Sequence, residues 1–81
     1  MRLDKWLKVS RLIKRRTVAN EACDAQKVMV NGKAARASYD VKVGDVIELS
    51  LGARQLRVRV DEVQETVAKN DAAMLYTVLE G

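Results

Sequence analysis

Histidine and proline are absent from the chain, and cysteine occurs once in its 81 residues. Without histidine the chain cannot form a histidine-based catalytic triad or a histidine-containing metal site. A lone cysteine cannot form an internal disulfide bond or build a zinc site, and it agrees with a reducing compartment. We therefore expect a protein that is not an enzyme and that binds no metal ion or cofactor.

Long apolar runs are also missing, so we expect no membrane-spanning helix. No stretch approaches the roughly 18 to 20 uninterrupted apolar residues that cross a bilayer. The basic N-terminal segment does not read as a signal peptide, because charged residues interrupt its apolar ones and no small-residue cleavage site follows. We expect a cytoplasmic protein without a membrane partner.

One group of acidic residues offers a remaining route to catalysis. Asp61, Glu62 and Glu65 could bind a cation or act as acid and base. They stand at a predicted strand end and in a polar segment, with no glycine-rich phosphate-binding loop beside them. We therefore interpret them as solvated surface residues.

Positive charge is concentrated at one end of the chain. The first 16 residues contain one acid, Asp4, and seven basic residues, a net charge of +6; the remainder carries eight basic and ten acidic residues, or −2. Such a distribution is typical of a polyanion-binding surface. An acidic substrate or an anionic membrane would be attracted by the same field.

The length predicts one small folded domain over residues 1–81, since no linker-like tract of glycine and serine is present. Its N-terminal part has helical periodicity. Leu3, Trp6 and Leu7 recur at helical spacing, which predicts a helix over residues 2–9 with this apolar face packed inward.

A second helix is expected from Thr17 to about Ala25. Val18, Ala22 and Ala25 are spaced by four and three residues, so we expect this stripe to face inward. Cys23 lies close to the stripe and is expected to be a small core residue. Two short helices at an angle would bring the basic residues of the first helix and of the connection onto one surface.

From residue 28 the pattern changes to the period of a β-strand. Val28 and Val30 alternate with Met29, and Asn31-Gly32 supplies the residue types of a tight hairpin turn. A β-hairpin is therefore expected directly after the helix pair.

The second half of the chain is expected to consist mainly of strands. Val43-Gly44-Asp45 predicts a turn that leads into the first of them. Residues 64–71 are expected to form a polar loop or an exposed turn of helix. The expected strands span residues 46–51, 56–63 and 74–79.

Several short motifs follow one another in a recognisable order. They are Arg2-Leu3-Asp4 with Trp6-Leu7, a basic helix pair, Val28-Met29-Val30-Asn31-Gly32, and Val43-Gly44-Asp45 before a strand. Together they resemble the S4 RNA-binding domain. The run from Arg2 to Thr17, with Met74-Leu75-Tyr76-Thr77 near the end, is similar to the RqcP family of stand-alone bacterial S4-type proteins. This likeness covers essentially the whole chain.

The resemblance implies an α+β fold, in which an N-terminal helix pair packs on a small, bent antiparallel β-sheet and RNA lies against the helices and the hairpin. It also implies a role in ribosome-associated quality control. The protein would bind large-subunit rRNA and peptidyl-tRNA on obstructed large subunits, and would support a partner, RqcH, in adding alanine to the stalled chain. A monomer is expected, because the factor must fit inside a ribosomal cleft.

Two positions depart from the S4 pattern. Gln26 stands where the family usually has glycine after the second helix, and Val43 stands where proline commonly precedes the Gly-Asp turn. A non-glycine residue in a left-handed helix end costs about 1 kcal/mol, so we expect a local rearrangement at Gln26.

Eight residues are candidates for direct RNA contact. They are Arg2, Lys5, Lys8, Arg11, Lys14, Arg15, Arg16 and Asn31. Arginine offers a planar fork for phosphate and can stack on exposed bases, so the arginines rank above the lysines, with Arg16 first. These charges could instead merely solvate a helix face, but opposite-charge partners four residues away are nearly absent.

Other polar and aromatic residues have simpler interpretations. Trp6 is expected in the core because it shares a helical face with apolar residues. The turn already explains Asn31, although its side chain could also contact RNA. Asp4 could orient a neighbouring arginine, but a favourable interaction with the helix dipole is the preferred interpretation.

Two further functions remain open. A protein-interaction adaptor could use the same basic face against an acidic protein surface. Binding to double-stranded DNA is less favoured, because helix-turn-helix and zinc-finger signatures are missing.

Overall fold

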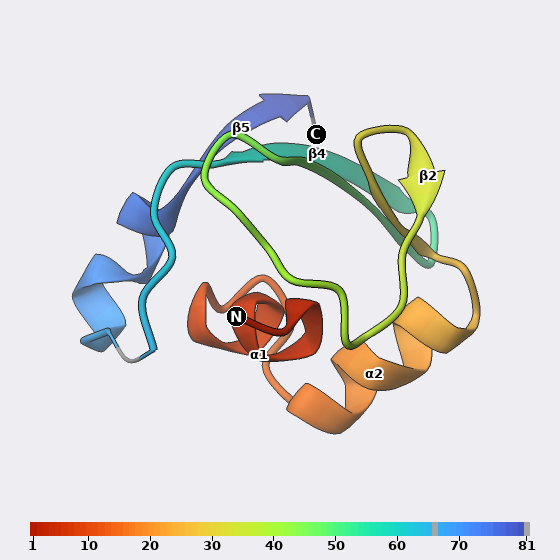
Figure 1. Cartoon of the computed structure of the whole chain (residues 1–81), viewed down its shortest axis with the longest axis horizontal. Coiled ribbons are helices and arrows are strands. Elements are labelled where there is room, and N and C mark those ends of the chain that lie inside the picture. The colour runs from red at the N-terminus through yellow and green to blue at the C-terminus, as the bar shows by residue number, and fades with distance from the viewer. Residues whose placement is uncertain (66, 81) are drawn as a thin grey trace.

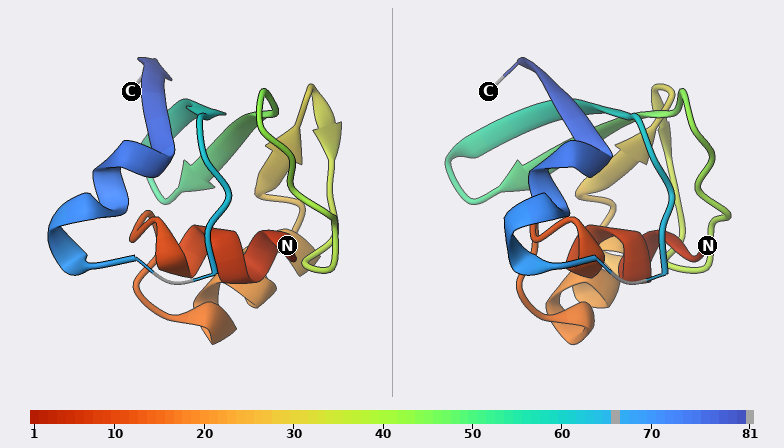
Figure 2. Two further views of the ribbon diagram at one scale, coloured as in Figure 1. Left: turned by 60° about the vertical axis from the view of Figure 1, so that its left-hand side comes forward. Right: turned by 90° about the vertical axis from the view of Figure 1, so that its left-hand side faces the viewer.

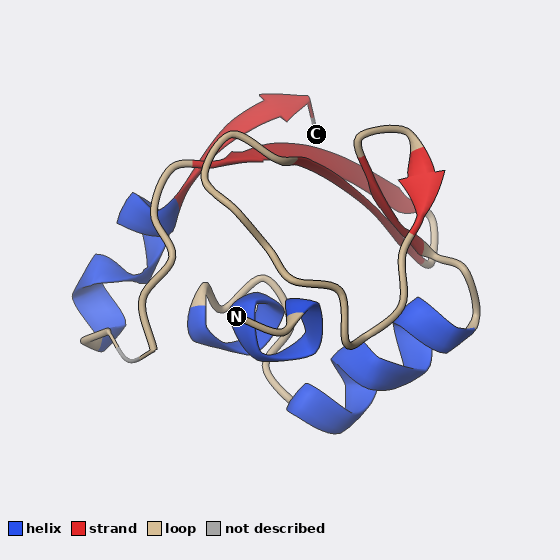
Figure 3. Ribbon diagram, in the orientation of Figure 1, coloured by secondary structure: helices blue, strands red, loops and turns tan. Residues whose placement is uncertain are grey.

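The computed structural model describes residues 1–65 and 67–80, with two helices beneath a curved antiparallel sheet (Figures 1 and 3). The five strands lie in the order β2-β1-β3-β4-β5. In chain order the elements are α1 (Leu3–Val9), α2 (Arg16–Asp24), β1 (Val28–Val30), β2 (Lys33–Ala34), β3 (Val46–Leu51), β4 (Arg54–Val60), the 3-10 helix η1 (Lys69–Leu75) and β5 (Tyr76–Glu80). The predicted α+β fold is confirmed.

The core lies between the concave side of the sheet and the helix pair, as the side views in Figure 2 show. Alternate residues of β1, β3 and β4 point into it, as strand periodicity requires. Leu3, Trp6 and Leu7 of α1 are fully buried against them. The buried strand residues are Val28, Val30, Ile47, Leu49, Val58 and Val60.

Helix α1 begins one residue later than predicted, and its first turn is held by a distant loop. The backbone N–H of Leu3 donates to the carbonyl of Tyr39 at 2.8 Å, and that of Asp4 donates to the carbonyl of Ala37 at 3.1 Å. These bonds satisfy amides that a helix N-terminus leaves without partners. They also fix the loop that follows β2 against the helix.

The predicted inward stripe of α2 is partly wrong: Ala22 and the neighbouring Cys23 are buried as predicted, but Val18 and Ala25 are not. Its buried residues are Ala19, Ala22 and Cys23, whereas Val18 is 43% exposed and Ala25 is exposed. The pattern favoured Val18 because it is the largest aliphatic side chain of the helix. Small residues occupy the inward positions, and they allow α1 and α2 to approach closely.

The expected rearrangement at Gln26 is also wrong. Gln26 keeps a left-handed conformation, with φ of 60°. Its N–H donates to the carbonyl of Cys23 at 3.0 Å, and the N–H of Lys27 donates to the carbonyl of Ala22 at 2.9 Å. These two bonds form a Schellman motif, a common helix C-terminus in which glycine usually occupies the position that Gln26 has here. The departure from the family pattern therefore changes the energy of the helix end and leaves its geometry intact.

The hairpin turn is confirmed, and a buried carboxylate ties it to the rest of the fold. Asn31 and Gly32 both have positive φ, 54° and 83°, as a tight primed turn requires. Asp45 accepts hydrogen bonds from the Asn31 amide at 3.1 Å and the Tyr39 hydroxyl at 2.9 Å. It also accepts one from the backbone N–H of Lys42 at 3.0 Å.

The C-terminal prediction is partly wrong. Residues 69–75 form η1, so the last strand begins at Tyr76 instead of residue 74, and β4 ends at Val60 instead of residue 63. The fully buried Leu75 explains the shift, because its carbonyl accepts the backbone N–H groups of Asp61 and Glu62. These contacts stop β4 and delay β5.

Candidate nucleic-acid interface

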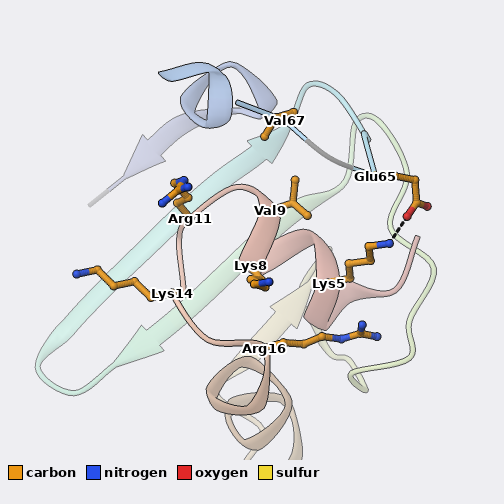
Figure 4. Close-up of a pocket in the computed structure, with 8 residues that line it drawn as sticks. All are labelled: Lys5, Lys8, Val9, Arg11, Lys14, Arg16, Glu65 and Val67. Atoms are coloured by element: carbon orange, nitrogen blue, oxygen red, sulfur yellow. Dashed lines mark hydrogen bonds and ion pairs between the residues drawn. The ribbon is translucent and has the colours of Figure 1, made fainter. Parts of the chain in front are cut away.

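Five predicted RNA-binding residues surround one depression beside α1 (Figure 4). Its volume is about 470 Å³. We call it the basic hollow, and its lining residues are Lys5, Lys8, Val9, Arg11, Lys14, Arg16, Glu65 and Val67. Five cations and one carboxylate thus share a single concave surface, which suits a polyanion.

Three consecutive parts of the chain supply these cations. Lys5 and Lys8 lie three residues apart on the side of α1 opposite Leu3 and Leu7, so burial of the apolar face turns them outward. The turn after α1 provides Arg11 and Lys14, and the first residue of α2 is Arg16. The angle between the helices gathers these five residues, for which the geometric prediction is confirmed; Arg15 of the same connection lies outside.

Arg11 has a backbone conformation that is unfavourable for a residue with a side chain. It has a φ of 62°, the left-handed conformation that favours glycine. Its N–H donates to the carbonyl of Lys8 at 3.0 Å, which closes the end of α1. A non-glycine residue costs about 1 kcal/mol in this conformation. The position therefore carries a basic side chain at the expense of stability.

Asp4 lies in the first turn of α1, where the dipole interpretation placed it, and it also organises two of the arginines. Its side chain is 3% exposed and accepts hydrogen bonds from Nε of Arg2 at 3.1 Å and Nε of Arg16 at 3.3 Å. Asn20 donates to the same carboxylate at 3.4 Å. The chain thus holds both guanidinium groups in place before any ligand arrives.

The charge state of Asp4 follows from these contacts. Burial works to raise the pKa of the carboxyl group, but the hydrogen bonds from Arg2, Arg16 and Asn20 outweigh it and lower the pKa below its ordinary value. The hydrogen bond to Asp4 also raises the pKa of the Arg2 guanidinium. The pair therefore stays ionised at neutral pH.

The remaining predicted site residues lie outside the basic hollow. Arg15 is exposed and lines neither this hollow nor the groove described next. Asn31 uses its side chain within the fold: the amide nitrogen donates to Asp45, and the amide oxygen accepts the N–H of Val46 at 3.0 Å. A direct RNA contact by either residue stays a prediction.

Arg2 lines a second depression together with Arg36, a residue that the sequence reasoning missed. This groove, of about 580 Å³, lies between α2 and the segment after β2. Small residues form much of its wall, which leaves it open. A signal was present, because Arg36 is flanked by Ala34-Ala35 and Ala37-Ser38 in a stretch with no other large side chain.

The aromatic side chains belong to the fold. Trp6 is fully buried, donates from Nε1 to the carbonyl of Glu62 at 3.1 Å, and packs edge-to-face on Tyr76 with ring centroids 6.4 Å apart. Cys23 is buried, and burial raises the pKa of its thiol to about 11, which leaves it protonated at neutral pH. The core interpretations of Trp6 and Cys23 are confirmed.

The acidic residues after β4 have separate partners. Asp61 accepts from Arg59 Nε at 2.9 Å, Glu62 accepts from Gln64 at 3.0 Å, and Glu65 pairs with Lys5. Within residues 1–65 and 67–80, no group of three or more acidic, cysteine or histidine residues is arranged to hold a metal ion. In the same part of the chain, no helix is long and apolar enough to cross a membrane.

Known proteins are similar to this chain in sequence and in fold. Residues 1–47 match the S4 domain family. The chain is 50% identical over 80 residues to the RQC P-site tRNA stabilizing factor of Bacillus subtilis, with 99% of this chain and 93% of that protein covered. It is 49% identical over 79 residues to the protein of the same name from Streptococcus pneumoniae, which covers 98% and 90%.

Two solved structures have the same architecture. The first is the trimeric Heat Shock Protein 15 of Vibrio cholerae, with a TM-score of 0.90, 30% identity, and coverage of 96% of this chain and 80% of that one. The second is the solution structure of the hypothetical protein HP1423, with a TM-score of 0.83, 30% identity, and coverage of 100% and 99%. Both superpose over nearly the whole of this chain.

Proposed function

The chain belongs to the S4 domain family, and we propose on that basis that it is an RNA-binding factor of ribosome-associated quality control. Its RNA targets would be large-subunit rRNA and peptidyl-site tRNA on obstructed large subunits. The names of the B. subtilis and S. pneumoniae relatives support the tRNA and the pathway. The observation that carries RNA binding is the basic hollow, where five cations meet around one concave surface.

The proposed mechanism is positioning without chemistry. Lysine and arginine side chains displace counterions from RNA phosphates, and arginine adds a directional fork. Because Asp4 already orients Arg2 and Arg16, less side-chain freedom is lost when RNA binds. A rigid basic surface held between rRNA and tRNA would stabilise one arrangement of the two, in which RqcH could extend the stalled chain with alanine.

We propose that the acting form is a cytoplasmic, ribosome-associated monomer. The V. cholerae relative is described as trimeric, so this part of the proposal needs its own measurement. Sedimentation equilibrium at the concentration used for binding should give the mass of a single 9.1 kDa chain. A threefold larger mass would contradict the monomer.

Co-sedimentation with isolated large subunits tests the proposed function. Wild-type protein should pellet with the subunits at moderate salt, more strongly when peptidyl-tRNA is present, and Arg16→Ala should lose most of this association. Glu21→Ala, on the exposed side of α2, is the control and should behave as wild type. Binding to subunits without any affinity for purified rRNA would instead indicate a protein-interaction adaptor.

A further inference from the structure

The basic hollow contains one acid among its described lining residues, and that acid is placed against a cation. Glu65 lies on the wall opposite α1, and its carboxylate accepts a hydrogen bond from Nζ of Lys5, as Figure 4 shows. The pair spans 60 positions of the sequence. The contact therefore results from the fold and not from local helix geometry.

Tertiary contacts hold the segment that carries Glu65 beside α1. Three residues before it, the carbonyl of Glu62 accepts the indole N–H of the buried Trp6. Val63 and Val67, on either side of Glu65, pack against the hydrophobic core. The backbone near Glu65 is thus anchored, and the carboxylate remains at the rim of the basic hollow.

Another anion can replace the Glu65 carboxylate as the partner of Lys5. The side chains are 36% and 70% exposed, and exposed ion pairs contribute little to stability because water and salt screen them. The hydrogen bond from Lys5 lowers the pKa of the Glu65 carboxyl group, so Glu65 is charged at neutral pH. An RNA phosphate that approached Lys5 would meet a carboxylate already bound there.

We infer that Glu65 is an internal competitor of RNA phosphate for Lys5, and so a residue that determines which RNA binds. The inference rests on the proposed RNA-binding function. A short flexible strand that offers few phosphates does not displace Glu65 and therefore binds without the contact to Lys5. A structured RNA that presents phosphates to Lys8, Lys14 and Arg16 together overcomes the competition. Glu65 therefore favours structured over single-stranded RNA.

The test compares Glu65→Gln with Glu62→Gln, which makes the same charge change three residues away without touching the basic hollow. Affinities would be measured across a salt series for a purified large-subunit rRNA fragment and for a 12-nucleotide oligouridylate. Glu65→Gln should bind oligouridylate about three- to fivefold more tightly than wild type at low salt, with a smaller gain for the rRNA fragment. Glu62→Gln should change either affinity by less than about twofold.

The salt dependence, and the same substitution in a Lys5→Gln variant, test whether Glu65 acts through Lys5. For oligouridylate, freeing Lys5 adds one phosphate contact, so the log-log slope for Glu65→Gln should steepen by about 0.7, whereas the slope for the rRNA fragment, which already reaches Lys5, should not change. In a Lys5→Gln background, Glu65→Gln should have no larger effect than Glu62→Gln. Circular dichroism would establish that each variant is folded, as expected for exposed side chains.

Distinct results would overturn the inference and the proposed function. Equal affinities for Glu65→Gln and Glu62→Gln, or a full gain that persists without Lys5, contradict the competition while leaving RNA binding in place. Wild-type protein that binds neither RNA at low salt contradicts the proposed function itself, and the inference with it.

Discussion

Asp4 shows how one residue can support a whole binding surface. A single buried carboxylate fixes Arg2 at the groove and Arg16 at the basic hollow, and Asn20 donates to it as well. Burial of the charge is costly, but these hydrogen bonds offset the cost and favour the ionised carboxylate. Two of the seven basic side chains in the first 16 residues are therefore oriented by the one acidic residue among them.

The lowered pKa of Asp4 predicts a dependence of stability on pH. Its folded-state pKa lies below the ordinary value of 3.8, so its contribution is complete above that value and is lost as the pH falls through the folded pKa. Urea unfolding should show the free energy of unfolding declining below about pH 4. Asp4→Asn should lower that free energy by about 1 to 2 kcal/mol at pH 7.

The same series separates Asp4 from the other carboxyl groups with lowered pKa values, Asp40, Asp61 and Glu65. In Asp4→Asn the decline below pH 4 should persist with a smaller amplitude. A variant that loses no stability at pH 7, or that keeps the full acid decline, would show that the arginines do not need this carboxylate.

Arg11 and Gln26 form a matched pair of strained residues. Both end helices in the left-handed conformation, with φ of 62° and 60°. Replacing either with glycine should stabilise the fold by about 1 kcal/mol, which raises Tm by about 4 to 8 °C in a domain of this size. Thermal unfolding followed by circular dichroism measures both shifts.

Their effects on RNA should differ. Arg11→Gly removes a cation from the basic hollow and should weaken binding to large-subunit rRNA, whereas Gln26→Gly removes no charge and should leave the affinity within about twofold. Stabilisation of both variants without loss of binding in Arg11→Gly would indicate that Arg11 does not contact RNA.

Substitutions in α2 test which face of this helix packs against α1. Ala19 is fully buried at this contact, and Val18 is exposed. Ala19→Leu should therefore destabilise the protein by about 1 to 3 kcal/mol through overpacking. Val18→Ala should change the free energy of unfolding by less than about 0.5 kcal/mol. The opposite order in urea unfolding would restore the inward stripe predicted from the sequence.

Elements set by local patterns were predictable. The strand over residues 46–51 and the Asn31-Gly32 turn have the predicted bounds, and α1 differs by one residue. The face of α2 was predictable only in part: periodicity placed Ala22 and Cys23 correctly, but it favoured Val18 over Ala19, because the close approach of the partner helix requires a small residue there. The bounds of the 3-10 helix were also missed, since the position of Leu75 depends on its contacts with the residues after β4.

The candidate site divides in the same way. The basic residues were visible as a run of like charge near one end of the chain, and the angle between α1 and α2 gathers five of them as expected. The positions of Arg36 and Glu65 relative to the basic residues became visible only in the fold. The loop after β2 places Arg36 in the same groove as Arg2. Glu65 contacts Lys5 although the two residues are 60 positions apart in the sequence.

At the scale of the whole molecule, the sheet and the cation-bearing surface are formed by different parts of the chain. The sheet lies over the helix pair (Figure 2), while α1, the turn after it and the start of α2 present five cations around the basic hollow (Figure 4). Because the N-terminal segment carries +6 and the rest −2, the field is directional. A polyanion is therefore steered towards the basic hollow from a distance of about one Debye length, roughly 10 Å at 0.1 M salt.

The most direct test of the central claim is the salt dependence of the affinity for a purified large-subunit rRNA fragment. If the five cations of the basic hollow each neutralise a phosphate, the slope of log K against log salt should be about −3.5 to −4.5, and the Lys8→Gln/Lys14→Gln double variant should be shallower by about 1.4 to 1.8. A slope near zero, or one that the double variant leaves unchanged, would contradict RNA binding at this surface.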